Sequence, residues 1–91
     1  MQAADDDEIF VYTGGDIPDD VKVICVNASI KNIADRTFSG HQYLEEVRLL
    51  DGIEKIGYGA FSSCKRLRRI NFPPSLKFIG MLAFAYCSEL S

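Results

Sequence analysis

The 91-residue chain has no tryptophan, one histidine, three prolines and three cysteines. Three widely spaced cysteines, Cys25, Cys64 and Cys87, cannot form the dense disulfide framework of small secreted domains. No apolar run approaches the ~18–20 residues that span a bilayer. Residues 5–8 are all acidic, whereas a secretory signal is basic and then apolar. These absences lead us to expect a cytoplasmic protein without a membrane partner.

The chain also lacks the positive charge on which nonspecific nucleic-acid binding depends. Its net charge is −3 and its isoelectric point is near 5.0, so we expect no nucleic-acid partner. Hydrophobic residues make up 47% of the chain and charged residues 25%, which is typical of a folded domain. A chain of this length holds one small core, so we expect a single fold.

A repeat of 23 residues organises the sequence. Steps of 23 link six sets of apolar residues, nineteen positions in all. The sets are Ile33, Ile56 and Ile79; Phe38, Phe61 and Phe84; Val21, Leu44, Leu67 and Leu90; Ile24, Val47 and Ile70; Val26, Leu49 and Phe72; and Ile30, Ile53 and Leu76. Such a period is typical of a stack of coils in which each coil buries its neighbour. The sequence therefore predicts a solenoid with Phe38, Phe61 and Phe84 in one interior file.

The apolar spacing differs between the two halves of each unit. Residues 47–49 alternate, which predicts a short strand with Val47 and Leu49 inward and Arg48 outward. In residues 56–67 the apolar positions recur at separations of three to five, which predicts one or two helical turns. A helix this short is stable only when it packs against neighbouring coils.

Two units share a more specific motif. The pattern Ile-Gly-x-x-Ala-Phe-x-x-Cys-x-x-Leu occurs at residues 56–67 and again at residues 79–90. It resembles the BspA-type leucine-rich repeat family, and the resemblance covers about residues 21–91. The unit at residues 33–55 departs from the motif, with Ala34 at the glycine position, Thr37 at the alanine position and His41 at the cysteine position.

The resemblance implies a right-handed α/β solenoid of short parallel strands and short helices, with about three to four 23-residue rungs. It implies binding of other macromolecules and no catalytic residues. We expect residues 1–8 to be a disordered acidic tail and residues 9–20 to be a capping strand and turn. Residues 21–91 would be the solenoid, truncated at its C-terminus because no polar capping segment follows Leu90.

The reactive side chains fit the repeat better than they fit an active site. Cys64 and Cys87 share one repeat position, so we expect two neighbouring thiols and no disulfide. His41 precedes Cys64 by 23 residues, but no third group is evident that would orient a nucleophile and base. Three scattered cysteines and one histidine do not form a zinc site. The prediction is a protein without catalytic residues, metal or cofactor.

Charged residues also follow the 23-residue step. Lys22, Glu45 and Arg68 share one column, Lys31, Glu54 and Lys77 share a second, and Glu46 and Arg69 share a third. Neighbouring strands lie about 4.8 Å apart, so these columns predict ladders of alternating charge between rungs. Of Lys65 and Arg66, only Arg66 has an acidic residue in its column, Glu89. A minor anion-binding surface at these two residues therefore remains an alternative.

We expect a non-catalytic protein–protein interaction module that binds a protein partner through the concave face of the sheet. The predicted contact residues are the outward ones: Val23, Cys25, Glu46, Arg48, Arg69 and Asn71. Two alternatives remain open at this point. The chain could be an architectural spacer in a larger repeat protein, or a fragment of a cell-surface adhesin whose export signal lies upstream.

Overall fold

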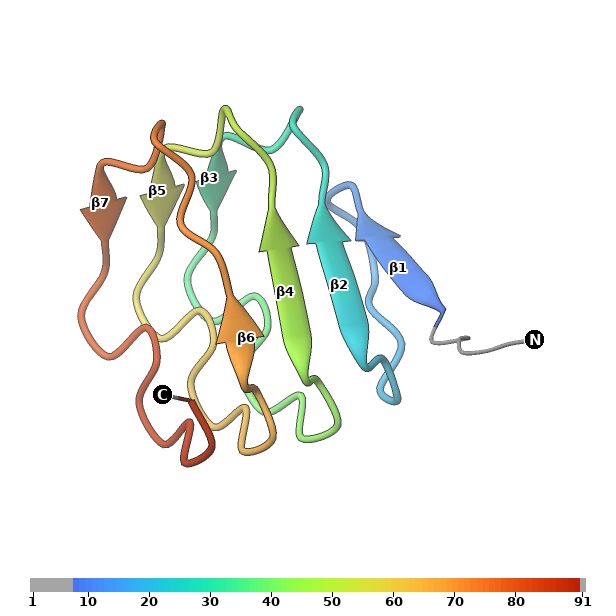
Figure 1. The fold of residues 1–91 in the computed structure, drawn as a ribbon. Helices are drawn as coiled ribbons and strands as arrows, with labels where there is room; N and C mark the ends of the chain where they lie inside the picture. Colours follow the sequence, from blue (N-terminus) through green and yellow to red (C-terminus); the bar gives the residue numbers. More distant parts are fainter. Residues whose placement is uncertain (1–7, 91) are drawn as a thin grey trace.

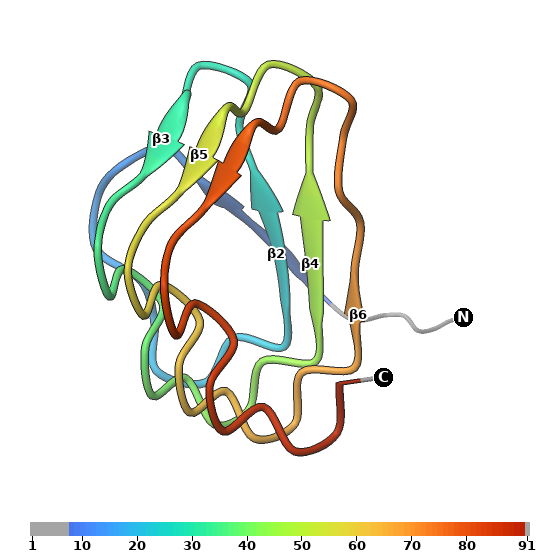
Figure 2. The same ribbon diagram turned by 90° about the vertical axis from the view of Figure 1, so that its left-hand side faces the viewer.

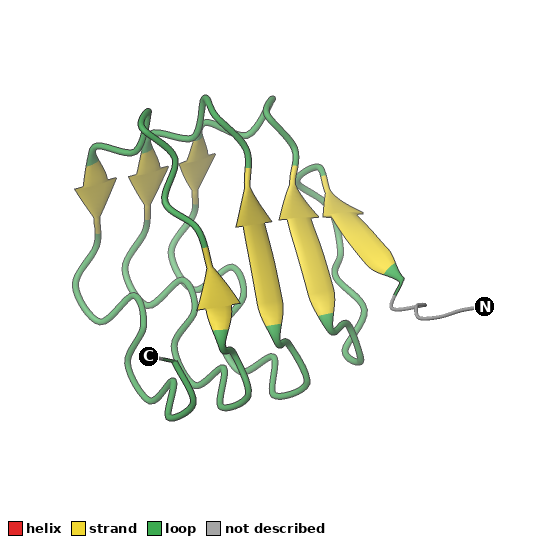
Figure 3. Ribbon diagram, in the orientation of Figure 1, coloured by secondary structure: helices red, strands yellow, loops and turns green. Residues whose placement is uncertain are grey.

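The computed structural model describes residues 8–90, and apart from Glu8 the predicted acidic tail lies outside them. The chain winds as a stack of coils with seven short strands (Figures 1 and 3). The strands are β1 (Ile9–Tyr12), β2 (Val23–Val26), β3 (Asn32–Ile33), β4 (Glu46–Leu49), β5 (Lys55–Ile56), β6 (Arg69–Ile70) and β7 (Phe78–Ile79).

Every strand pair is parallel, and the pairs form two sheets. One sheet has the order β1-β2-β4-β6 and the other has the order β3-β5-β7. The two sheets form two sides of the coil, and the loops between them close the third side (Figure 2). Val47 pairs with Ile24 on one side and with Ile70 on the other, so the strand register repeats the 23-residue step. The predicted parallel solenoid is confirmed, and its right-handed sense stays a prediction.

Strand β4 shows why the sequence alternates. Val47 and Leu49 are buried, whereas Arg48 between them is exposed. Successive side chains of a strand point to opposite faces, so the apolar pair enters the core and the arginine faces solvent. The core formed in this way contains no buried polar residue among residues 8–90.

The predicted file of phenylalanines runs through the centre of the stack. Phe38 and Phe61 stack with ring centroids 5.1 Å apart, and Phe61 and Phe84 stack at 5.4 Å. Tyr12 packs edge-on against Phe38 at one end, and Phe72 packs edge-on against Phe84 at the other. Each aromatic ring is one of the largest apolar surfaces that a residue can bury, so this file carries much of the stability of the stack.

The prediction of short helices is wrong. No helix occurs anywhere in residues 8–90, and residues 57–67 form a run of turns. We call this run and its equivalents, residues 34–44 and 80–90, the turn segments. None of the described residues therefore belongs to a helix that could cross a membrane.

Hydrogen bonding explains why the turn segments are not helical. The amide of Phe38 donates to the carbonyl of Ala60 in the next coil (2.8 Å), whereas the amide of Thr37 before it donates to the carbonyl of Ala34 in the same coil (3.3 Å). The amides of Phe61 and Ala60 repeat this alternation one coil later. In an α-helix, backbone amides donate to carbonyls of the same segment. In the turn segments, alternate amides donate to the next coil instead, so these amides are satisfied without a helix.

Backbone conformation also excludes a helix. Arg36, Gly59 and Leu82 are 23 residues apart, and each has a φ near +60°. The same holds for Gly40, Ser63 and Tyr86, whose φ values lie between 61° and 79°. Left-handed residues end a right-handed helix, and side chains other than glycine adopt this conformation only at a cost. The left-handed positions therefore belong to the repeat itself, although the residue types at them vary.

Gly57 marks where neighbouring coils come closest. A methyl group at this position would lie 2.6 Å from Asp35 Oδ1 and 2.7 Å from the carbonyl oxygen of Ile33. Both groups hold the coils together, because the Gly57 amide donates to Ile33 and the Tyr58 amide donates to Asp35. Gly80 has the same tight approach to Gly57. Glycine at this repeat position is required by backbone contact.

We predict that Gly57→Ala lowers the free energy of unfolding by about 2–4 kcal/mol, because backbone atoms cannot yield to the added methyl. Gly15→Ala is the matched control, since a methyl there meets no atom within 4 Å. Urea denaturation measures both variants. Equal stability of the two variants would contradict the close packing of the coils.

Candidate functional site

The outward side of the four-stranded sheet is the candidate site, and we call it the sheet face. Two columns of side chains run across it from strand to strand. The first column is Ile9, Val23, Glu46 and Arg69, and the second is Val11, Cys25 and Arg48. Both columns pass from apolar residues on β1 to charged residues on β4 and β6, so the two halves of the face differ in chemistry.

The predicted contact residues are not equally available on this face. Arg48 and Arg69 are exposed, and Cys25 and Glu46 are half-buried. Val23 is only 6% exposed, so it offers little surface to a partner. The sheet face therefore presents two arginines as its most accessible charged groups.

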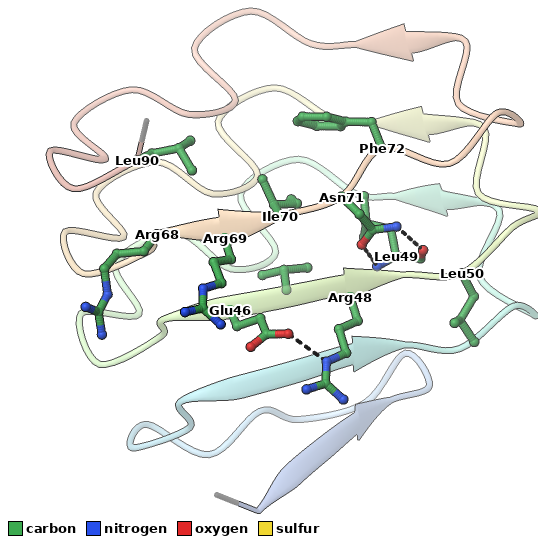
Figure 4. A pocket seen from close by; sticks show the side chains of 11 residues that line it. Glu46, Arg48, Leu49, Leu50, Arg68, Arg69, Ile70, Asn71, Phe72 and Leu90 are labelled. Atoms are coloured by element: carbon green, nitrogen blue, oxygen red, sulfur yellow. Dashed lines mark hydrogen bonds and ion pairs between the residues drawn. The ribbon is translucent and has the colours of Figure 1, made fainter.

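Glu46 makes an ion pair that the sequence did not predict. Its carboxylate accepts a hydrogen bond from Arg48 Nε at 2.7 Å, two residues further along the same strand (Figure 4). This hydrogen bond raises the pKa of the Arg48 guanidinium, which is positively charged at neutral pH in any case. The predicted ladder between Glu46 and Arg69 does not form, and Arg69 has no ion pair within residues 8–90.

The predicted ladder of Lys22, Glu45 and Arg68 forms in part: Arg68 pairs with Glu45, whereas Lys22 makes no ion pair within residues 8–90. Arg68 Nη2 lies 3.0 Å from Glu45 Oε1 in the preceding coil, and Glu89 lies 3.8 Å from Arg68 Nε. These side chains are largely exposed, so the pair adds at most about 1 kcal/mol. The Lys31, Glu54 and Lys77 column shows no ion pair in the described part of the chain.

Asn71 has a role that the repeat pattern did not reveal. Its Nδ2 donates to the carbonyl of Leu49, and its Oδ1 accepts from the amide of Leu49, both at 2.8 Å. The side-chain amide thus replaces the backbone pairing that would extend β6 beyond Ile70. The sequence predicts Asn71 as a partner contact, whereas its side-chain amide bonds to Leu49 within the sheet. An asparagine following a short strand is compatible with this role, but the sequence gives no stronger signal.

An open groove of about 890 Å³ lies where the sheet face meets the free edge of β6 (Figure 4). Its apolar residues are Val47, Leu49, Leu50, Ile70, Phe72 and Leu90, and its polar residues are Glu46, Arg48, Arg68, Arg69 and Asn71. Leu50 belongs to none of the repeated apolar sets, and the repeat predicts Phe72 to be buried. Both side chains are exposed in the structure. The groove combines an apolar surface with arginine side chains.

His41 and Cys64 do not form a nucleophile–base pair. Cys64 Sγ donates to the carbonyl oxygen of Phe38 at 3.1 Å, and His41 Nδ1 donates to the same oxygen at 3.2 Å. Cys87 Sγ repeats the cysteine contact by donating to the carbonyl of Phe61 at 3.0 Å. Both thiols thus tie a turn segment to the preceding coil. Residues 8–90 contain no cluster of side chains suited to hold a metal ion.

Burial controls the ionisation of these thiols. Burial raises the pKa of the Cys64 thiol to about 12, and the neighbouring Cys87 adds to the rise. Burial also raises the pKa of Cys87. Only a thiolate is strongly nucleophilic, so neither residue is suited to nucleophilic catalysis at neutral pH.

A family model described as "BspA type leucine rich repeat region (6 copies)" matches residues 18–91. The chain belongs to the BspA-type leucine-rich repeat family. The crystal structure of a leucine-rich repeat protein from Bacteroides ovatus ATCC 8483 is similar to it, with 29% sequence identity and a TM-score of 0.52. The match covers 76% of this chain and 24% of the Bacteroides protein. No curated protein matches the chain at a significant level.

The family motif and the structure together explain why the unit at residues 33–55 departs from the pattern. In the later units, the glycine leaves room for the backbone of the preceding turn segment. The cysteine thiol donates to the phenylalanine carbonyl of that preceding segment. No turn segment precedes residues 34–44 within the described chain, so Ala34 meets no such constraint. His41 bonds to Phe38 in its own segment, and Thr37 Oγ1 donates to Ala34.

We predict that iodoacetamide modifies Cys25 of the native protein at least about a hundredfold faster than Cys64. At about pH 8, a pKa of 12 leaves roughly one Cys64 thiol in ten thousand as thiolate, and the side chain is fully buried. Mass spectrometry of digested protein measures both rates. In denaturant the two cysteines should react alike, and equal rates in the native state would contradict the buried position of Cys64.

Proposed function

We propose that the chain is a non-catalytic protein-interaction module that binds its partner through the sheet face. The observation that carries this proposal is the exposure of Arg48 and Arg69 on adjacent parallel strands beside an open groove. Membership of a leucine-rich repeat family supports the general role, because stacked repeats form extended binding surfaces.

The sheet supports recognition by fixing where its side chains lie. Arg48 is held by the Glu46 carboxylate, and β4 is paired on both sides, with β2 and with β6. A guanidinium that is already oriented loses less entropy on binding a carboxylate, which it contacts through two parallel hydrogen bonds. Arg69 lacks such a partner among the described residues and is free to make one.

The groove indicates the chemistry of the partner. Ile70 and Phe72 offer an apolar surface next to the arginines, so a complementary segment carries apolar side chains interspersed with aspartate or glutamate. The few residues involved cover less than the ~800 Å² per partner that stable complexes bury. Binding by this chain alone is therefore of modest affinity.

The architectural alternative makes the opposite prediction. A segment that only spaces or stiffens a larger protein binds nothing through Arg48 and Arg69, so changing them would affect no interaction. The adhesin alternative concerns where the protein acts, and it requires the same kind of surface. A binding experiment on the sheet face therefore separates the interaction module from the spacer.

We predict that peptides selected from an unbiased display library on the native protein bind Arg48→Glu/Arg69→Glu about tenfold more weakly or worse. Reversing both charges removes charge-assisted hydrogen bonds and repels acidic side chains. Fluorescence anisotropy with the selected peptides measures the affinities.

Lys31→Glu/Lys65→Glu is the matched control, because it changes the net charge by the same amount at exposed residues off the sheet face. The control should bind the peptides within about twofold of the native protein. Equal losses in both double variants would show nonspecific charge attraction, and no loss in either would contradict binding through the sheet face.

A further inference from the structure

The two ends of the stack differ in their surface chemistry. Six of the large apolar side chains that are exposed fall within residues 72–86, which make up the last coil. They are Phe72, Phe78, Ile79, Met81, Leu82 and Tyr86, and Met81 and Tyr86 are 74% and 78% exposed. Exposed apolar side chains concentrated in one part of a molecule are candidates for macromolecular contact. The last described coil therefore carries more exposed large apolar side chains than the rest of the described stack.

Charge is also distributed unequally between the ends. Residues 8–35 carry five acidic and two basic side chains, whereas residues 36–90 carry eight basic and five acidic ones. The N-terminal part is thus acidic, and the C-terminal part is basic by the same amount. The two ends attract each other when they belong to different copies of the chain.

Among residues 8–90, both outermost strands of the larger sheet have one edge that pairs with no other strand. Strand β1 pairs there with β2 alone, and strand β6 pairs with β4 alone. An unpaired edge presents backbone donors and acceptors that another strand can satisfy. Since all strands of the sheet are parallel, β1 of a second copy can extend the sheet at β6 without a change of direction.

The register of such an extension follows from β1 itself. Ile9 pairs with Val23, so it occupies the column of Glu46 and Arg69. A strand β1 that follows β6 by the same step places Phe10 over Ile70 and Tyr12 over Phe72. Phe10 and Tyr12 already pack against the core of their own stack, where Tyr12 lies 5.0 Å from Phe38. The apolar side chains of the two edges therefore meet on the same side of the extended sheet.

The same register completes a charge ladder. Glu8 precedes Ile9 as Lys22 precedes Val23, so Glu8 belongs to the column of Lys22, Glu45 and Arg68. A second copy seated on β6 brings its Glu8 beside Arg68. Within residues 8–90, the acidic group near Arg68 on that side is Glu89, whose Oε1 lies 3.8 Å from Arg68 Nε. Charges then alternate through the junction as they do within the stack.

We propose that copies of this chain associate head to tail, with β1 of one copy pairing with the free edge of β6 in the next. The contact uses Ile70 and Phe72, which also line the groove of the proposed partner site, so a second copy and a partner compete for these residues. Partner binding additionally depends on the outward arginines Arg48 and Arg69, which the contact between copies does not use. It is a heterologous contact, so a second copy leaves a new free β6 edge and association continues with rising concentration.

Sedimentation velocity from micromolar to millimolar concentration tests this inference with the full chain. We expect reversible species larger than a dimer at high concentration and weaker association as salt is added. E8K and R68E should each lower the association constant about tenfold, because like charges then face each other. The double variant E8K/R68E should restore it to within about threefold of the native value, because the pair is rebuilt with its signs exchanged.

Phe72→Ser tests the apolar part of the contact and should also weaken association. Tyr58→Ser is its control, because Tyr58 is an exposed aromatic residue in the middle of the stack. Urea denaturation confirms that each variant is folded. A chain that stays monomeric at all concentrations, a closed dimer that salt strengthens, or a double variant that fails to recover would overturn the head-to-tail contact.

Discussion

Contact between equivalent residues of successive coils is the constraint on which the rest of this structure depends. Phe38, Phe61 and Phe84 stack on one another, and alternate amides of the first two turn segments donate to the segment that follows. No coil could bury its apolar side chains or satisfy its amides alone, so stability belongs to the neighbouring pairs. The same contacts hold β2, β4 and β6 in register and thereby fix the spacing of the arginines on the sheet face.

Stacking also accounts for what differs between the ends. A turn segment that follows another one contacts it through a glycine and a cysteine, as Gly57 and Cys64 do. The first turn segment has no described segment before it, and it has Ala34 and His41 at these two repeat positions. At the other end, exposed large apolar side chains are concentrated in residues 72–86 of the last described coil. Departures from the repeat are thus consequences of position in the stack, and they coincide with the surfaces available for contact.

Much of this fold could be predicted from the 23-residue period, because burial against equivalent neighbours leaves an apolar residue at every inward position. The period did not distinguish the turn segments from short helices. Apolar residues at separations of three to five also occur in turns whose alternate amides donate to another coil. The period also missed Asn71, whose amide bonds to Leu49, and the pairing of Glu46 with Arg48. Those contacts depend on side-chain geometry within one strand or at its end, which a column of residue types does not encode.

Amide hydrogen exchange, resolved residue by residue by nuclear magnetic resonance in dilute protein, tests the stacking of coils most directly. The amides of Phe38 and Phe61 donate to the following coil, whereas that of Phe84 has no acceptor among residues 8–90. The account predicts slow exchange at Phe38 and Phe61 and fast exchange at Phe84, although all three occupy the same repeat position. Similar exchange at the three amides would contradict bonding between coils.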